Sequence, residues 1–312
     1  MKELLVSVLT PVYNGESHIA RLLDSVLGQT YPHIEMILAD DGSTDATIQV
    51  AETYVSRFKE RGYSLTVVSA PHKNASAAIN TGLPYVNGEY LIWPDSDDEL
   101  LPDSVETRVR FLRQHPEYQC VRSVMEYVSG ETGAPVKPAE KLGDLEQTEI
   151  FLDVLESRSF VCCGCYMLRT EPFFHIYPSR KIPEYDVGQN FQMLLPFLYQ
   201  HQCPTINQKL YRVYVRQNSH SRRLLSKREE AVKFKQFELL VDEIAEICQI
   251  KDRAILLRIA LWKTRRRRYL AQKYHSYFNL AVYNVEIKLL SWRLRIIRRF
   301  RSGRKAQPCV KS

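Results

Sequence analysis

The chain has 312 residues, of which 45% are hydrophobic and 25% charged, and this composition excludes a disordered or fibrous protein. Its formal net charge of +7 conceals a division, because residues 1–220 carry 19 basic and 28 acidic side chains whereas residues 221–312 carry 24 and 8. The first part is therefore acidic (−9) and the last part strongly basic (+16), which indicates different roles for the two parts.

The first hundred residues alternate patterns of strand and helix. Apolar, β-branched runs predict strands, and apolar residues at helical spacing predict the helices between them. In chain order we expect a strand over 4–12, a helix over 19–27, a strand over 34–39, a helix from Ser43 or Thr44 to about Arg61, a strand over 65–69, a helix over 75–85 and a strand over 89–93. This order predicts an α/β fold with a mostly parallel sheet and helices on both faces.

Polar clusters follow three of these strands, at Tyr13-Asn14, Asp40-Asp41 and Asp95–Asp98. Ligands of such sheets bind at the carboxyl ends of the strands. The sequence therefore predicts a binding site at this edge of the sheet.

The rest of the chain falls into two parts. A helix over 103–114, a strand near 119–128 and shorter elements up to about residue 220 indicate a second half of the same domain. No proline occurs between Pro204 and Pro308 and no glycine between Gly188 and Gly303, so we expect helices over 226–300. The predicted organisation is a domain over 1–221 followed by a basic helical region over 222–312.

The start of the chain does not resemble an export signal, because its apolar stretch lasts only about six residues before Pro11. No later apolar run approaches the roughly 20 residues of a membrane-spanning helix, so we expect neither feature. The seven cysteines are an odd number, and we expect reduced thiols. Cys162, Cys163 and Cys165 lie close together, but the lack of a second ligand pair and the apolar flanks favour packing over a zinc site.

The turn Asp95-Ser96-Asp97-Asp98 places three carboxylates together after a strand. Their mutual repulsion is unfavourable unless a cation neutralises it or the acids cap a helix. One interpretation is that Asp97 or Asp98 caps a helix beginning near Leu101. The other is a site for Mg²⁺ or Mn²⁺, which take carboxylate oxygens and leave positions open for phosphate.

Three segments together resemble glycosyltransferase family 2: TPVYNGESHIARLLDSVLGQTYPHIEMILADDGSTD, then NASAAINTGL, then NGEYLIWPDSDDELLP. The resemblance is strong over about residues 5–105 and weaker up to about 220. It implies the GT-A fold, a Rossmann-like nucleotide-sugar fold, and transfer of a sugar from a nucleotide sugar, for which a UDP-sugar is expected, with inversion of the anomeric carbon.

The resemblance also implies roles for the residues at the ends of the first two strands. Pro11 and Tyr13 match the turn that packs on the nucleotide base and ribose, and Glu16 helps to hold the nucleotide. Asp41 matches the residue that accepts a hydrogen bond from uracil N3–H, with Asp40 supporting it.

Asp95 and Asp97 match the family's D-x-D motif. The resemblance makes Asp97 a direct metal ligand, places Asp95 near ribose and metal, and leaves Asp98 to a supporting position or a helix cap. A divalent cation there offsets the negative charge that develops on the leaving diphosphate.

The chain departs from the family where the general base is expected. Gln189 and Asn190 stand in place of the Glu and Asp of the family's G-E-D-W segment, and neither amide accepts a proton at neutral pH. We expect Asp186 to be the base, with Glu184 as the second candidate. The alternatives are an impaired site, or two acids that only solvate a loop after Pro183.

Three further positions concern the diphosphate. Following a strand-like stretch, His220 resembles the family's C-terminal histidine, which approaches the diphosphate or the metal, although an inert surface histidine is the alternative. Arg216 and Arg222 would bind phosphate or be solvated. Where many relatives have A-R-N this chain has Ala78-Ile79-Asn80, so Lys73 is the substitute cation.

The basic region contains four consecutive arginines at 265–268 and a stretch WRLRIIRRFR at 292–301. One helical face would carry the apolar side chains of Val285, Leu289, Trp292, Ile296 and Phe300. Flanking arginines suit a helix lying on an anionic membrane surface. The alternatives are a core-packing helix with a solvated basic side, and nucleic-acid binding, for which no recognised motif is present.

The resemblance and the basic region together imply a metal-dependent hexosyl- or N-acetylhexosaminyl-transferase, cytoplasmic and peripheral on the inner face of a bacterial membrane. Its expected cofactor is Mn²⁺ or Mg²⁺, and its expected acceptor is a lipid-linked or growing surface glycan; nucleic acid is not an expected partner. A sugar nucleotidyltransferase is a rival, but Pro11–Glu16 lacks the glycine-rich phosphate loop with Arg and Lys. A non-catalytic nucleotide- or glycan-binding protein is the other rival, motivated by Gln189 and Asn190.

Overall fold

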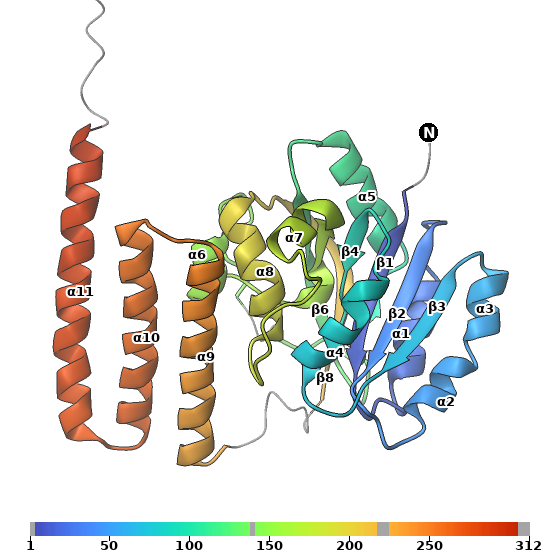
Figure 1. Ribbon diagram of the computed structural model, residues 1–312, viewed down its shortest axis with the longest axis horizontal. Coiled ribbons are helices and arrows are strands. Elements are labelled where there is room, and N and C mark those ends of the chain that lie inside the picture. The colour runs from blue at the N-terminus through green and yellow to red at the C-terminus, as the bar shows by residue number, and fades with distance from the viewer. Residues whose placement is uncertain (1–3, 138–140, 217–224, 305–312) are drawn as a thin grey trace, which may run out of the picture. The chain divides into compact units, whose positions relative to one another are not determined.

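The computed structural model describes residues 4–137, 141–216 and 225–304 (Figure 1). The chain forms two compact units, Met1–Arg223 and Leu224–Ser312.

The first unit is built on an eight-stranded sheet. Its strands are β1 (Val6–Val12), β2 (Ile34–Asp40), β3 (Ser64–Ser69), β4 (Tyr90–Ile92), β5 (Glu99–Leu100), β6 (Cys120–Ser129), β7 (Tyr166–Arg169) and β8 (Thr205–Val215), in the order β3-β2-β1-β4-β7-β6-β8-β5. β1 pairs in parallel with both β2 and β4, and β2 pairs in parallel with β3. The predicted α/β sheet is confirmed, although β7 and β5 pair antiparallel with their neighbours and make its second half mixed.

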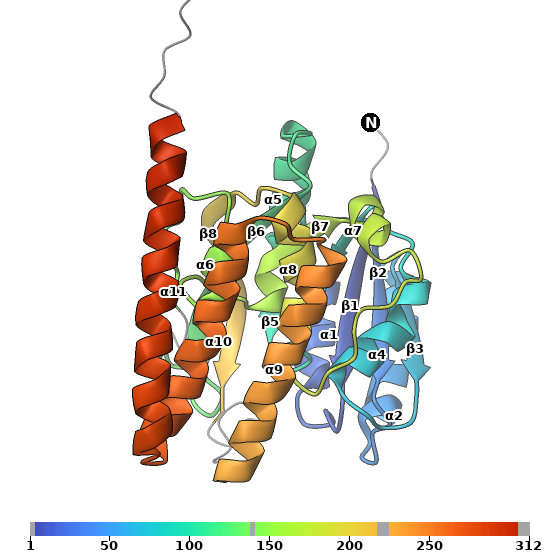
Figure 2. The same cartoon turned by 60° about the vertical axis from the view of Figure 1, so that its left-hand side comes forward.

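Helices lie on both faces of this sheet, with α4 in front of β1 and β2 and α1 behind (Figures 1 and 2). Their bounds are α1 (Ile19–Leu27), α2 (Thr47–Glu52), α3 (Val55–Glu60), α4 (Ala75–Gly82), α5 (Ser104–Gln114), α6 (Phe151–Leu155), α7 (Thr170–Ile176) and α8 (Gln189–Gln200). The apolar positions of α1 are buried as its spacing predicts, and Val8, Leu9 and Leu91 of the central strands have no solvent exposure. This core holds β1, β2 and β4 side by side, so their carboxyl ends meet at one edge.

Two predictions about helix starts are wrong. The expected helix from Ser43 or Thr44 is two short helices, α2 and α3, and Asp45 rather than either residue accepts the first backbone N–H, that of Thr47, at 3.0 Å. No helix begins near Leu101 either, because β5 occupies residues 99–100 and α5 begins at Ser104. The helix-capping interpretation of Asp97 and Asp98 therefore fails.

The second unit consists of helices α9 (Lys227–Ile247), α10 (Arg253–Lys273) and α11 (Tyr277–Arg304). Ser226 and Glu229 form a capping box at the start of α9, and the Asp252 side chain caps α10. The predicted helical region is confirmed. Within the described part of the chain, no helix combines the length and apolar character needed to cross a membrane.

Candidate active site

The loops that follow β1 and β2 are bound to each other at the carboxyl edge of the sheet. Asn14 adopts a left-handed backbone conformation (φ +49°), donates its N–H to Ser43 Oγ at 2.8 Å, and accepts the Thr44 N–H on Oδ1 at 2.8 Å. The Glu16 carboxylate accepts the Ala46 N–H at 3.2 Å, just before α2. Because these hydrogen bonds link one loop to the other, the two loops form a single continuous surface.

Asp40 supports the turn after β2. Its buried carboxylate accepts the backbone N–H groups of Gly42 and Ser43, each at 3.2 Å. Gly42 has φ +72°, and a Cβ on it would lie 2.6 Å from the backbone nitrogen of His72. The turn therefore requires glycine at this position.

Asp41 meets Tyr13 through a residue that the sequence analysis missed, His72. The Asp41 side chain is 5% exposed; it accepts the Lys73 N–H at 2.9 Å and lies 2.8 Å from His72 Nδ1. The His72 ring stacks on the Tyr13 ring, with centroids 3.9 Å apart and planes 15° apart. A signal was present in the sequence, because His72 follows the third strand of the sheet and so falls at the same edge as the first two.

The acidic turn after β4 lies beside this surface, since Thr10 of β1 donates its hydroxyl to the Pro94 carbonyl at 3.0 Å. Asp98 is buried and accepts the Tyr214 N–H of β8 at 2.9 Å. Burial raises the pKa of Asp98 well above its ordinary value, and the nearby carboxylates of Asp97 and Asp95 raise it further. Asp98 therefore serves to fasten the turn to β8.

Asp97 is partly exposed, unlike Asp98, and Arg216 forms an ion pair with it. Arg21 of α1 donates to the Asp97 carbonyl at 3.0 Å. His18, which no sequence pattern indicated, also lies here: its Nδ1 is 3.3 Å from an Arg216 guanidinium nitrogen and its Nε2 is 3.5 Å from Ser96 Oγ. Burial, and next the charge of Arg216, lower the pKa of His18, so the ring favours its neutral form.

The donor set of this turn fits a hard cation, because Asp95 and Asp97 offer carboxylate oxygens. Among the described residues, no group of three or more His, Cys, Asp or Glu side chains is arranged to hold a metal ion. The predicted third ligand, His220, lies outside the described residues, as does Arg222. Cys162, Cys163 and Cys165 are free thiols, and burial raises the pKa of Cys163 well above its ordinary value.

The two expected bases lie on a loop that is docked against α4. Asn80 exchanges two hydrogen bonds with the backbone of Ile182, at 2.8 and 2.9 Å. Glu184 pairs with Lys73 and accepts the Asn80 amide at 3.1 Å. Its hydrogen bond with Lys73 is the largest cause that lowers the pKa of Glu184, so this carboxylate holds a proton weakly.

Asp186 has a different partner. Its Oδ1 accepts the neutral side-chain amide of Asn74, the N-cap of α4, at 2.9 Å. Lys73 and Asn74 are adjacent, so Glu184 and Asp186 are both fixed near the loop that carries His72. Asn190, for which the resemblance predicted the position of the family's base, lies in the first turn of α8 and accepts the Trp93 indole N–H at 3.4 Å.

The arginine run of the second unit contributes to packing. Arg266 lies over the rings of Phe234, Phe237 and Trp262, with its guanidinium carbon 4.2 to 4.7 Å from their centroids. Burial lowers the pKa of Arg266 to about 10. The guanidinium of Arg267 makes two hydrogen bonds to the buried Glu238, and Arg268 donates to Asn284. Three of the four arginines are therefore bound within the helical unit.

Residues 7–176 match the family model described as "Glycosyl transferase family 2". A putative teichuronic acid biosynthesis glycosyltransferase, TuaG of Bacillus subtilis strain 168, is 35% identical over 133 residues, which are 42% of this chain and 50% of that protein. The chain spans half or less of the length of the curated relatives it matches.

Two solved structures have a similar fold. S. aureus TarS 1–349 in complex with UDP-GlcNAc is 18% identical, covers 86% of this chain and 81% of its own, and has a TM-score of 0.59. The mannosyltransferase PcManGT of Pyrobaculum calidifontis, in complex with GDP-Man and Mn²⁺, is 17% identical, covers 94% and 85% of the two chains, and has a TM-score of 0.56. At these identities the likeness concerns the fold.

Proposed function

The chain belongs to glycosyl transferase family 2, and from this membership we propose that it transfers a sugar from a nucleotide sugar, a UDP-sugar, to a hydroxyl of a lipid-linked or growing surface glycan, with inversion. The observation that most supports this is the meeting of Tyr13, Asp41 and the acidic turn at one edge of the sheet. TuaG, named for teichuronic acid biosynthesis, and TarS, with its bound UDP-GlcNAc, support the choice of acceptor and donor.

The nucleotide would lie on the surface shared by the loops after β1 and β2. Tyr13, which directly follows the end of β1 that contains Pro11, offers a ring face to the base, and Asp41 offers a carboxylate to uracil N3–H. The His72 ring covers the Tyr13 ring and contacts the Asp41 carboxylate, so it would have to turn aside when the base binds. Glu16 keeps the two loops together through Ala46 and so shapes the ribose side.

Asp97 and Asp95, with His220, would hold Mn²⁺ or Mg²⁺, which when bound neutralises charge on the leaving diphosphate. PcManGT with its bound Mn²⁺ supports this cofactor. Arg216, which pairs with Asp97, would turn its guanidinium to the phosphate oxygens when the cation is bound. Lys73 stays bound to Glu184 and orients that carboxylate.

Asp186 is the proposed general base. It removes the proton of the acceptor hydroxyl, whose oxygen attacks the anomeric carbon while the bond from that carbon to the diphosphate breaks. Glu184 suits this role less well than Asp186, because its hydrogen bond with Lys73 stabilises the Glu184 carboxylate without a proton.

We place the protein at the inner face of the cell membrane, as a peripheral protein attached through its C-terminal basic helices. The exposed apolar side chains of Val285, Leu289 and Trp292 on α11 support this, since they lie among lysine and arginine. Vesicle flotation with and without residues 280–312 tests the attachment. Equal flotation on anionic vesicles would contradict it.

The Gln189 and Asn190 amides favour one rival, a non-catalytic protein that binds nucleotide or glycan. Release of UDP from a panel of UDP-sugars with Mn²⁺, and of GDP from GDP-mannose, separates the two. A transferase releases nucleotide from at least one donor, and Asp97→Ala abolishes the release. Tight UDP binding with no release or transfer under any condition would establish the binding protein.

A further inference from the structure

Helix α11 presents an apolar stripe that repeats every seven residues. Phe278, Val285 and Trp292 form one row and Val282, Leu289 and Ile296 the next. The first five of these positions are 45 to 80% exposed. Such a stripe on a helix indicates a partner of matching apolar character.

The charges beside the stripe distinguish among partners. Lys288 and Arg295 lie on one side of it and Arg293 on the other, all exposed. Glu286, the acidic residue of α11, accepts a hydrogen bond from Thr264 of α10 and is not exposed. A second copy of this chain would bring like charges together, whereas an anionic bilayer matches them.

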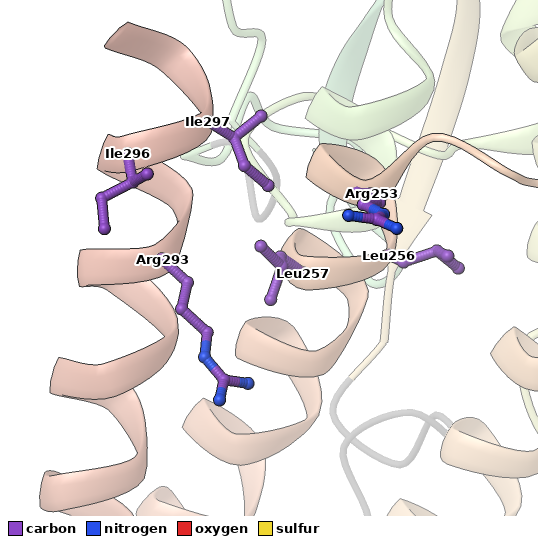
Figure 3. Close-up of a pocket in the computed structure, with 6 residues that line it drawn as sticks. All are labelled: Arg253, Leu256, Leu257, Arg293, Ile296 and Ile297. Atoms are coloured by element: carbon purple, nitrogen blue, oxygen red, sulfur yellow. The ribbon is translucent and has the colours of Figure 1, made fainter. Parts of the chain in front are cut away.

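A groove between α10 and α11 opens beside this stripe, with a volume of about 480 Å³. Aliphatic side chains line it from both helices, and Figure 3 shows Leu257 and Ile297 pointing into the space between them. Ile296 belongs to both the groove and the stripe. A molecule lying along the stripe can therefore enter the groove without leaving an apolar surface.

Two arginines, Arg253 and Arg293, complete the lining of the groove. Both are exposed, and neither forms an ion pair with a carboxylate of the described residues. Arg253 is the first residue of α10, where the helix dipole disfavours a positive charge. The charge of Arg253 therefore does not stabilise α10.

We propose that this groove binds one anionic phospholipid of the bilayer, with an acyl chain between Leu257 and Ile297 and its phosphate at Arg253 or Arg293. The proposal rests on the membrane attachment proposed above and adds a lipid site to it. A lipid of the same leaflet is favoured because the groove is continuous with the stripe that meets the bilayer.

The test uses the full-length protein and monomeric dihexanoylphosphatidylglycerol below its micellar concentration, with binding followed by titration calorimetry. We expect saturable binding that dihexanoylphosphatidylcholine and inorganic phosphate do not reproduce. Filling the groove from either helix, with Leu257→Phe or Ile297→Phe, is expected to weaken binding at least tenfold, and circular dichroism confirms the fold. Absence of binding to the wild type, or equal binding by both folded variants, would overturn the proposal.

Vesicles of phosphatidylglycerol and phosphatidylcholine test the two arginines. Removing both in Arg253→Gln/Arg293→Gln is expected to weaken vesicle binding about 30-fold, from about 1 kcal/mol for each cation. Arg228→Gln/Arg265→Gln is the matched control, because it removes the same charge from exposed positions outside the groove. If both double variants lose vesicle binding equally, the lipid site is refuted, and the arginines act only through general electrostatic attraction to the anionic vesicle.

The remaining outcomes concern the source of the lipid and the activity. Binding of a polyprenyl phosphate in place of the phospholipid would refute the assignment of a phospholipid to the groove. Nucleotide release is measured in the same preparations, and we expect the groove variants to retain it in detergent. A protein that releases no nucleotide but binds the lipid would fail the proposed function and still support the lipid site.

Discussion

Replacing Asp186 by asparagine is expected to lower turnover by about 10²- to 10⁴-fold while the fold and the donor affinity stay the same. The hydrogen bond from Asn74 ends on Asp186 Oδ1, and the oxygen of an asparagine side chain accepts it equally well. The loop that carries residue 186 also keeps its bonds to Asn80. The substitution therefore keeps the hydrogen bond to Asn74 and removes proton acceptance, a loss of about 3 to 5 kcal/mol of transition-state stabilisation.

Glu184→Gln is the matched control, because it removes a carboxylate two residues away on the same loop. Its ion pair with Lys73 is partly exposed, 60% at the lysine and 33% at the glutamate, so its loss costs less than about 1 kcal/mol of stability. We expect turnover within about threefold of the wild type, because this carboxylate does not take the proton.

The assay is nucleotide release at saturating donor, with the sugar donor that gives the highest rate in the panel. Donor affinity is measured separately, by calorimetry with UDP. If Asp186→Asn keeps more than a tenth of the wild-type turnover while Glu184→Gln loses it, the assignment of the base is reversed. If both variants keep it, the base lies elsewhere, and Asn190→Asp then tests the position that the family uses.

Three more changes test other parts of the site. His72→Ala uncovers the Tyr13 ring and frees one Asp41 oxygen. UDP is therefore expected to bind about fivefold more tightly, because about 1 kcal/mol of stacking and hydrogen bonding to His72 no longer has to be broken. Weaker binding in calorimetry would instead mean that His72 itself contacts the bound base. Gly42→Ala forces a side chain into φ +72° and against the His72 backbone, and should lower the free energy of unfolding by about 1 to 3 kcal/mol in urea titrations; an unchanged midpoint would contradict the turn geometry. Folding lowers the pKa of His18, so the unfolded chain takes up the proton first and stability falls as the pH drops below about 6.5. In His18→Gln, the difference between the urea midpoints at pH 7.5 and pH 5.5 should be smaller than in the wild type. The same difference in both proteins would show that His18 does not cause this pH dependence.

The sequence predicted the first half of the sheet well because each strand there is a continuous apolar run with helical spacing between the runs. The position of β5 was missed, since two residues carry too little pattern to separate a strand from a turn. The helix predicted up to Arg61 was also too long. The sequence contains no proline or glycine between Thr47 and Glu60 that would divide it, and the break between α2 and α3 arises in the folded structure.

The site was predictable as far as residue types and strand ends reach. Tyr13, Asp41 and the acidic turn were found because strand ends share one edge, but the partners of Asp41 were not. His72 contacts Asp41, which lies 31 residues away in the sequence. His18 lies next to Arg216, which in turn pairs with Asp97. Contacts of this kind depend on how loops fold over the edge, which residue spacing does not encode.

The stacking of Arg266 on three aromatic rings limits how the basic region responds to salt. Lys263, Arg267 and Lys273 are likewise matched by carboxylates of α9, namely Asp242, Glu238 and Glu230. Cations bound in this way hold few mobile counterions, so they release few when the protein meets an anionic surface. The salt dependence of vesicle binding should therefore reflect only the outward cations of α11 and the groove. It should be much weaker than a region with a formal charge of +16 would show if all its cations met the surface.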